Sequence, residues 1–324
     1  MAAAKYWLGV DLGGTKMLAA VFNRDFKLLA ARKTKTSGQD GAQAVLAGIK
    51  ELVAETLREA GLRPTSVGGL GVGVPGPVNV KDGTVLTAPN LGWRNLPAQK
   101  ILQRACRLPT LVMNDVDAGT YGEYRFGAGD QARCVLGLFP GTGIGGGCVY
   151  EGQVLHGREH SCFEVGHLRM VPDGRLCGCG RYGCLEAHAS RLAIAADAAA
   201  AVYRGQAPAL RDLVGTDLRE IKSRTLAKAI AAGDRAVEDI VRRAARLLGV
   251  ATAGMVNLLA PDVVVLGGGL VEALEQLYLE EVRAAVEQQA MPFLGRTVKV
   301  RAARLGDHAG VMGAAALAAN ALGR

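Results

Sequence analysis

A strand, a glycine-rich turn and a second strand occur twice in this chain, and this repeat limits the fold more than any other feature. The first copy, WLGVDLGGTKMLAAVF, starts at Trp7, and the second, CVLGLFPGTGIGGGCVY, starts at Cys134. Helical patterns and further aliphatic strands follow each copy. Two α/β halves, each opening with a glycine hairpin, are the simplest arrangement that accounts for this order.

Strands and helices alternate along both halves. In the first half we expect strands over 6–10, 17–22, 26–36, 66–78 and 109–118, and helices over 37–60 and 96–107. In the second half we expect a hairpin over 134–150, an insertion over 159–186, helices over 187–203, 234–259 and 271–289, strands over 262–270 and 297–303, and a final Ala-rich helix. This alternation predicts an α/β fold.

The length of the chain, 324 residues, predicts two lobes, because a single hydrophobic core usually stops growing below this size. We expect a small α/β lobe over 1–115, with the C-terminal helix, at about 308–324, packed back on it. The large α/β lobe is expected over 116–307 and contains the inserted segment 159–186.

Composition and charge exclude several classes of protein. Hydrophobic residues make up 49% of the chain and charged residues 21%, as in an ordinary globular domain. No apolar stretch approaches the roughly 18 residues of a membrane span, and the start MAAAKYWLGVDLGG does not resemble a signal peptide. We therefore expect a cytoplasmic protein without a membrane partner. The net charge of +8 comes from scattered Lys and Arg, which predicts a solvated basic surface and no nucleic-acid partner.

The chain has seven cysteines, an odd number that argues against a disulfide scaffold in a cytoplasmic protein. Cys106, Cys134 and Cys148 lie in apolar segments, where we expect small core residues. Cys162 has no assigned role. The other three cysteines are concentrated in the segment RLCGCGRYGCLEAHAS, residues 175–190.

The spacing within this segment predicts a metal site. Cys177, Cys179 and Cys184 follow a Cys-x-Cys-x4-Cys pattern, which differs from the Cys-x-x-Cys of a thioredoxin-like redox unit. Zn²⁺ prefers four thiolate or imidazole ligands in a tetrahedron, and the intervening glycines let the chain turn around a small ion. The candidate fourth ligands are His160, His167 and His188. His167 is the most economical choice. A set of three cysteines and one histidine leaves no open position, so the zinc is predicted to be structural.

Three glycine-rich turns at strand ends predict binding of a nucleotide's phosphates. The first differs from a Walker A loop, because Thr15 separates the glycines from Lys16 and a strand follows. Its backbone can still approach phosphate oxygens, and Asp11 at the strand end can hold Mg²⁺ through water. The residues that we assign to the nucleotide and its metal are Asp11, Gly13, Gly14, Thr15 and Lys16 in the first turn, Gly141, Thr142 and Gly143 in the second, and Gly267, Gly268 and Gly269 in the third.

The segment PTLVMNDVDA suggests acid–base chemistry. Asn114 and Asp115 come at the end of a strand, where a carboxylate can accept the proton of an alcohol during phosphoryl transfer. Either residue can instead cap the following helix, and the residues alone leave both interpretations open. Asp117 is interpreted as a charge in the first turn of that helix.

These motifs resemble those of a known family. DLGGTK, GTGIGGG and LGGGL resemble the two phosphate motifs and the adenosine motif of the superfamily of actin, sugar kinases and heat-shock ATPases. EVGH followed by CGCGRYGCLE resembles the signature of the ROK family, which contains bacterial glucokinases, other hexose kinases and repressors. The resemblance spans essentially the whole chain. It implies an actin-like (ribonuclease H-like) ATPase fold of two lobes with a cleft and a zinc-binding insertion in the larger lobe.

The resemblance also implies roles for single residues. It selects His167, from EVGH, as the fourth zinc ligand and Asp115 as the catalytic base. The residues that it implies for the hexose site are Asn90, Asn114, Asp115, Glu164, His167 and Glu186. The implied cofactors are ATP, catalytic Mg²⁺ and structural Zn²⁺, and the implied assembly is a homodimer or homotetramer.

The function expected from this resemblance is ATP-dependent phosphorylation of a hexose, with D-glucose as the first choice. The alternatives are a kinase for N-acetylmannosamine, N-acetylglucosamine, fructose or allose, polyphosphate as a second phosphoryl donor, and a non-catalytic sugar sensor. ROK repressors carry a DNA-binding domain before the kinase-like body. Because Asp11 comes so early in this chain, we do not expect a repressor.

Overall fold

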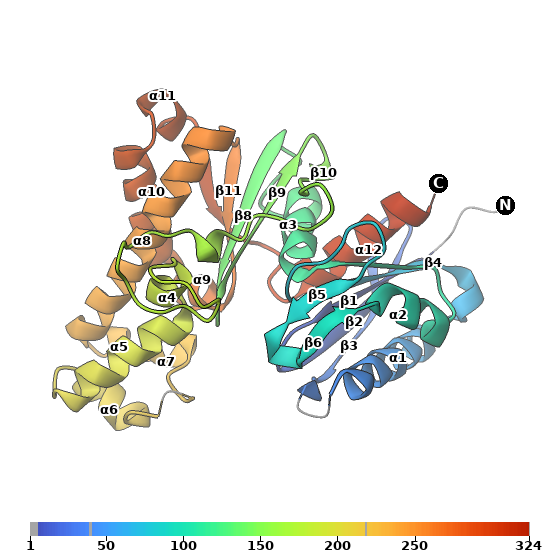
Figure 1. Ribbon diagram of the computed structural model, residues 1–324, viewed down its shortest axis with the longest axis horizontal. Helices are drawn as coiled ribbons and strands as arrows, with labels where there is room; N and C mark the ends of the chain where they lie inside the picture. Colours follow the sequence, from blue (N-terminus) through green and yellow to red (C-terminus); the bar gives the residue numbers. More distant parts are fainter. Residues whose placement is uncertain (1–5, 39–40, 218, 324) are drawn as a thin grey trace. The chain divides into compact units, whose positions relative to one another are not determined.

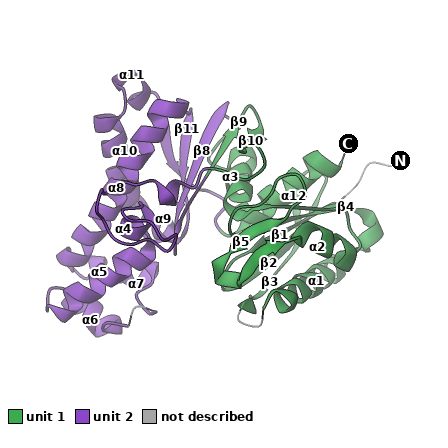
Figure 2. Ribbon diagram, in the orientation of Figure 1, with its two compact units in different colours: residues 1–131, 147–162, 307–324 green, residues 132–146, 163–306 purple. Residues whose placement is uncertain are grey.

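The computed structural model describes residues 6–38, 41–217 and 219–323 as an α/β protein of two compact units (Figures 1 and 2). The first unit comprises 1–131, 147–162 and 307–324, and the second comprises 132–146 and 163–306. The ends of the expected small lobe, at 1–5 and 324, lie outside the described residues, as do residues 39 and 40 of the helix expected over 37–60.

The first unit is a five-stranded sheet with helices on its faces. The strand order is β3-β2-β1-β4-β7, in which β1, β4 and β7 are parallel neighbours and β2 and β3 are antiparallel. The strands are β1 Tyr6–Leu12, β2 Lys16–Asn23, β3 Leu28–Lys35, β4 Val67–Val74 and β7 Thr110–Asn114. The helices are α1 Ala42–Glu59, α2 Ala98–Cys106, α3 Asp115–Phe126 and α12 His308–Leu322. A small hairpin pairs β5 Val85–Ala88 with β6 Trp93–Leu96.

The glycine-rich sequence of β4 separates the two faces of this sheet. Leu70 and Val72 belong to the aliphatic core that also contains Ile49 of α1. The intervening glycines point to the opposite face, where a Cβ on Gly71 would overlap the carbonyl of Ala314 in α12. Helix α12 therefore packs directly on the backbone of the sheet, a close approach that residues with side chains would prevent.

The second five-stranded sheet has the order β10-β9-β8-β11-β12. Its strands are β8 Cys134–Pro140, β9 Ile144–Tyr150, β10 Gln153–Val154, β11 Val263–Leu266 and β12 Lys299–Ala302. β11 runs parallel to both β8 and β12. The helices of the second unit are α4 Glu186–Ala189, α5 Arg191–Tyr203, α6 Pro208–Val214, α7 Ser223–Ala231, α8 Arg235–Leu259, α9 Gly269–Ala273, α10 Glu275–Gln289 and α11 Pro292–Gly295. The long helices α8 and α10 pack along each other (Figure 1).

Both glycine hairpins and the α/β class are confirmed, and several elements differ from expectation. The helix expected over 271–289 is divided into α9 and α10, because Leu274 has a non-helical backbone with φ −140° and ψ 43°. The β5–β6 hairpin and helices α6 and α7 were not predicted. Their sequences are short, and short elements give weak periodic patterns. None of the helices in the described part of the chain combines the length and apolarity needed to cross a membrane.

Candidate functional site

Two carboxylates lie at the carboxyl-terminal edge of the first unit's parallel strands. Asp11 in β1 pairs with Gly73 of β4, and the next residue of β4 pairs with Asn114, the last residue of β7. Helix α3 begins immediately afterwards at Asp115. A Cβ placed on Gly73 would lie 3.3 Å from Cα of Asp115, so the start of α3 closely approaches β4. The fold thus brings Asp11 and Asp115 to one edge of the sheet.

Both carboxylates hold their protons more tightly than usual. Burial, together with the negative charges of Asp11 and Asp117, raises the pKa of Asp115 to about 8 against backbone hydrogen bonds that lower it. Burial also raises the pKa of Asp11 to about 6, opposed by the positive charge of Lys16. Clustered groups with raised pKa values are typical of sites that transfer protons or bind cations.

Asn114 caps the start of α3, which was one of the two roles expected for it. Its Oδ1 accepts hydrogen bonds from the backbone N–H groups of Val116, at 2.9 Å, and Asp117, at 3.0 Å. Its Nδ2 donates to the carbonyl of Gly76 at 3.1 Å. These bonds satisfy orphan donors at the start of α3 and fix the backbone that carries Asp115.

Asp117 lies in the first turn of α3, as expected, but its carboxylate is buried with an exposed fraction of 1%. Neither carboxylate oxygen has a hydrogen-bond partner among the described residues, and Nε2 of the His156 ring lies 3.5 Å from Oδ2. Burial raises the pKa of Asp117, and His156 lowers it. The pair faces a cavity of about 70 Å³ that Asn114 and Ser161 also line.

The first glycine turn is held by a backbone bond within the turn and by contacts with Thr36 and Asp307. The N–H of Gly13 donates to the carbonyl of Lys16 at 2.9 Å, and the hydroxyl of Thr36 donates to the carbonyl of Gly13 at 2.7 Å. The ammonium of Lys16 is bonded to Asp307 at 2.9 Å. Gly14 and Thr15 are exposed, and a Cβ on Gly14 would lie 3.9 Å from the Cβ of exposed Asn90. Gly14, Thr15 and Lys16 are thus the exposed residues of this turn, and the ammonium of Lys16 is paired with Asp307.

The second glycine turn is held by side chains from elsewhere in the second unit. Oε2 of Glu186 accepts the N–H of Ile144 at 2.9 Å. Arg191, the first residue of α5, donates its N–H to the carbonyl of Gly141 at 2.9 Å and its Nη2 to the hydroxyl of Thr142 at 3.0 Å. A Cβ on Gly143 would overlap the Glu186 carboxylate. Glu186 is therefore bonded to the turn next to the sheet.

The third glycine turn lies beside the second. Gly267 donates its N–H to the carbonyl of Leu138 in β8 at 2.9 Å. A Cβ on Gly268, which has φ +81°, would lie 2.8 Å from the carbonyl of Pro140, where the second turn begins. The two turns thus follow the carboxyl ends of the neighbouring parallel strands β8 and β11, where α/β sheets commonly bind ligands.

The four predicted metal ligands come together in the second unit. One ligand atom from each of His167, Cys177, Cys179 and Cys184 lies within 4.8 Å of the others. The Sγ atoms of Cys179 and Cys184 are 3.7 Å apart, and Sγ of Cys177 is 3.6 Å from Nδ1 of His167. Zn–S bonds of about 2.3 Å and Zn–N bonds of about 2.0–2.1 Å give tetrahedral edges of about 3.8 and 3.6 Å. The cluster therefore fits a zinc ion.

The rival histidines are placed differently. Nε2 of His188 accepts the N–H of Arg175 at 3.1 Å, and His160 lies in a bridge with Asn79 of the first unit. The ring of His167 is exposed and turns Nδ1 toward Cys177, which leaves Nε2 for another partner. Among the other cysteines, Cys134 and Cys148 are buried as expected, Cys106 is half-buried, and Cys162 donates to a backbone carbonyl.

The residues implied for a hexose site divide between the units: Asn90, Asn114 and Asp115 belong to the first, and Glu164, His167 and Glu186 to the second. The sequence did not single out Arg191, Asp307 or His156. Each contacts a candidate residue far from it in sequence, so no local pattern marks it.

Known proteins resemble this chain over nearly its whole length. Residues 7–321 match the ROK family. A glucokinase of Halalkalibacterium halodurans is 32% identical over 313 residues, which cover 95% of this chain and 93% of that protein. A xylose repressor of Caldicellulosiruptor bescii is 27% identical over 96% of this chain and 77% of the repressor.

The fold agrees with a solved structure. The ROK family glucokinase of Streptomyces griseus in complex with glucose and AMPPNP superposes with a TM-score of 0.84, at 34% identity over 96% of this chain and 98% of that one. The two-lobed α/β fold, the paired glycine turns and the cluster of one histidine and three cysteines thus occur in a chain whose sequence matches one family from end to end. The protein belongs to the ROK family.

Proposed function

We propose that the protein is a sugar kinase that uses ATP and Mg²⁺ to phosphorylate D-glucose to glucose 6-phosphate. The observation that carries this proposal is Asp115, a half-buried carboxylate with a pKa raised to about 8 at a strand edge beside Asp11. The similarity to the glucokinases of Halalkalibacterium halodurans and Streptomyces griseus supports glucose as the acceptor and ATP as the donor.

Asp115 would act as the general base. Its carboxylate would accept the proton of the sugar hydroxyl that attacks the γ-phosphate, and such assistance is typically worth about 10²–10⁴-fold in rate. Asn114 would keep that carboxylate in place through its bonds to the first turn of α3. In the free protein only the ionised form accepts a proton, so activity should rise as the pH rises toward about 8.

Asp11 would serve the magnesium ion that accompanies ATP. Magnesium keeps several of its waters in proteins, and a single carboxylate at a strand end suits binding through them. When bound, this ion would neutralise charge on the phosphates. Exposed Gly14 and Thr15 and the turn at Gly141–Gly143 would contact the phosphates through backbone N–H groups and hydroxyls.

Zinc would be held by His167, Cys177, Cys179 and Cys184 and would have a structural role, because all four tetrahedral positions are filled by protein atoms. It would orient the His167 ring, so that Nε2 can meet a sugar hydroxyl while Nδ1 faces the metal. It would also fix the chain that leads to Glu186, and hence the second glycine turn.

The direct test is a coupled assay of ADP release with ATP and Mg²⁺ across glucose, fructose, allose, mannose, N-acetylglucosamine and N-acetylmannosamine. We expect the highest kcat/KM for glucose. A higher value for another sugar would replace glucose as the substrate while retaining the kinase. Glucose binding without ADP release from any sugar would contradict the kinase and favour a sugar sensor. Measuring glucose 6-phosphate formed with tripolyphosphate in place of ATP would test whether polyphosphate is a second phosphoryl donor.

A further inference from the structure

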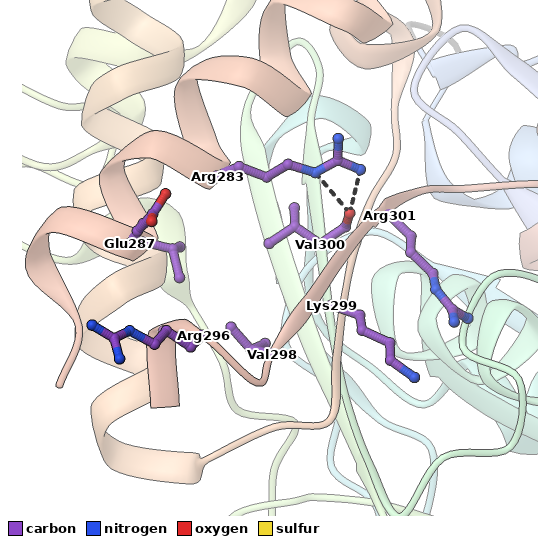
Figure 3. A pocket seen from close by; sticks show the side chains of 9 residues that line it. Arg283, Glu287, Arg296, Val298, Lys299, Val300 and Arg301 are labelled. Atoms are coloured by element: carbon purple, nitrogen blue, oxygen red, sulfur yellow. Dashed lines mark hydrogen bonds between the residues drawn. The ribbon is translucent and has the colours of Figure 1, made fainter. Parts of the chain in front are cut away.

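Two arginines of the second unit differ in what their guanidinium groups contact. Arg283 of α10 donates Nε and Nη2 to the carbonyl of Val300 in β12, at 3.2 and 2.8 Å, beside a hollow of about 540 Å³ (Figure 3). Lys299, which precedes Val300, points away from Arg283, so these two cations do not converge on one ligand (Figure 3). Arg191 of α5 instead contacts the second glycine turn, and it forms no ion pair with any described carboxylate.

Arg191 is fixed to the second glycine turn by both its backbone and its side chain. It is the first residue of α5, and Oγ of the preceding Ser190 caps this helix by accepting the N–H of Ala193 at 3.3 Å. The N–H of Arg191 donates to the carbonyl of Gly141 at 2.9 Å, and its Nη2 donates to the hydroxyl of Thr142 at 3.0 Å. Thr142 is exposed and Arg191 is half-buried, so the guanidinium group lies at the open side of the turn.

The turn and Arg191 together carry hydrogen-bond donors that have no acceptor. Neither the N–H of Thr142 nor that of Gly143 has a partner among the described residues. A guanidinium group has several N–H donors, and in the described part of the chain that of Arg191 bonds Thr142 alone. Glu186 accepts the N–H of Ile144 at 2.9 Å and forms no ion pair with Arg191. Donors and positive charge without an acceptor favour an anion at this turn.

The first glycine turn also carries a cation, but a carboxylate already pairs with it. Lys16 bonds Asp307 at 2.9 Å, and Lys33 bonds the same carboxylate at 2.8 Å. Hydrogen bonds from Lys33 and Lys16 lower the pKa of Asp307 to about 2, so this carboxylate stays ionised at neutral pH. A phosphate group would have to compete with Asp307 for Lys16, whereas Arg191 has no such competitor among the described residues.

We propose that Arg191 is a phosphate-binding residue, whose guanidinium group bonds the phosphate oxygens of the nucleotide at the turn Gly141–Gly143. This inference rests on the proposed use of ATP. The planar guanidinium group matches pairs of phosphate oxygens, and its bond to Thr142 holds it in place before the nucleotide binds. Arg191 therefore recognises the phosphates of the nucleotide and contributes nothing to the binding of its adenosine part.

The test is calorimetric titration of the full-length protein with ADP in the presence of Mg²⁺, and separately with adenosine. Arg191→Gln should weaken ADP binding about tenfold or more, because a charge-assisted contact is lost, and should leave the affinity for adenosine within about twofold. The glutamine amide can still donate to the Thr142 hydroxyl, so the turn keeps this bond. Arg191→Lys keeps the charge without the planar group and should give an intermediate ADP affinity. The matched control is Arg204→Gln, which removes an exposed guanidinium group at the other end of α5 and should stay within about twofold of the unchanged protein.

The outcomes separate phosphate binding from a structural role. Equal ADP affinity in Arg191→Gln and the Arg204→Gln control would overturn the proposal. Equal losses of ADP and adenosine affinity in Arg191→Gln would also overturn it, because Arg191 would then shape the whole site. The readout is binding, so it is independent of the sugar assay. If ADP bound to the unchanged protein but no sugar were phosphorylated, the kinase would be contradicted while the role of Arg191 in phosphate binding would stand.

Discussion

Two glycine turns, one after β1 in the first unit and one after β8 in the second, have similar strand–glycine–strand sequences. The residues that surround them differ. The first turn is closed by the Gly13–Lys16 backbone bond, contacts Thr36 and Asp307, and lies at the end of the strand that carries Asp11. The second has a backbone bond from Gly141 to Gly143 and is bonded by Glu186 and Arg191, which follow the cysteine cluster. A repeated backbone unit thus supplies two similar loops, and other segments of the chain give one loop acidic neighbours and the other a support from residues that follow the cysteine cluster.

Because of this difference, we expect substitutions in the first unit to cause the largest losses of kcat. Asp115→Asn should lower kcat by about 10²–10⁴-fold while glucose still binds, because the base is lost but its shape is kept. Steady-state kinetics and calorimetry with glucose measure the two effects. Asp82→Asn, at an exposed turn of the same unit, is the control and should retain full activity. If Asp115→Asn turned over substrate at nearly the rate of the control, Asp115 would not be the general base.

The same substitution has a consequence for stability. The folded pKa of Asp115 is raised from 3.8 to about 8, so the folded state binds this proton more tightly than the unfolded chain does. Its contribution to stability is full below pH 3.8 and is lost as the pH rises through about 8. The free energy of unfolding of Asp115→Asn, relative to that of the unchanged protein, should therefore increase from pH 6 to pH 9. Denaturant unfolding at both pH values measures this, and an equal difference at both would contradict it.

The support of the second turn, which follows the cysteine cluster, predicts the next largest effect. Cys179→Ser should lower zinc content and melting temperature and should weaken sugar binding, because the cluster loses a thiolate and the chain toward Glu186 loosens. Metal analysis, thermal melting and glucose titration measure these changes. Cys162→Ser is the control, since a serine can keep the hydrogen bond to the Leu155 carbonyl. Active, freshly purified protein without zinc would rule out the structural zinc.

Glu186 tests whether the second turn depends on that support. Glu186→Ala removes the acceptor for the Ile144 N–H and should raise KM for ATP about tenfold, the worth of one charge-assisted hydrogen bond. Glu186→Gln keeps an oxygen acceptor and should show a smaller rise. Steady-state kinetics with varied ATP compare the two variants. If both raise KM for glucose and leave KM for ATP unchanged, Glu186 serves the sugar and not the turn.

The smallest expected effect concerns Asp117. The charge of Asp117 raises the pKa of Asp115, so Asp117→Asn should move the acid limb of the kcat/KM profile to lower pH, by less than about one unit. A purely structural role for Asp117 would leave the position of this limb unchanged. Glu159→Gln, which removes an exposed carboxylate of the same unit, is the control.

The sequence predicted the parts of the fold that depend on neighbouring residues. Both hairpins, the strand at β11 and the long helix α8 follow alternating or helical patterns of apolar residues, and all were expected. The cysteine cluster was expected because its ligands are close in the chain and their spacing is itself a chemical signal. The division of α9 from α10 and the short helices α6 and α7 were missed, since tertiary packing decides such boundaries.

The amino-acid sequence specifies which chemical groups the protein has: two glycine hairpins, a strand-end Asn–Asp pair, and a set of three cysteines with one histidine. The tertiary structure alone decided which partner each group meets. Glu186 bonds Ile144 across a separation of 42 residues in the chain, and Lys16 meets Asp307 from the other end of the sequence. Such pairings depend on how strands and helices pack, and a hydrogen bond between distant residues leaves no periodic trace in the sequence. Sequence therefore specified the chemistry available, and packing assigned each side chain its place.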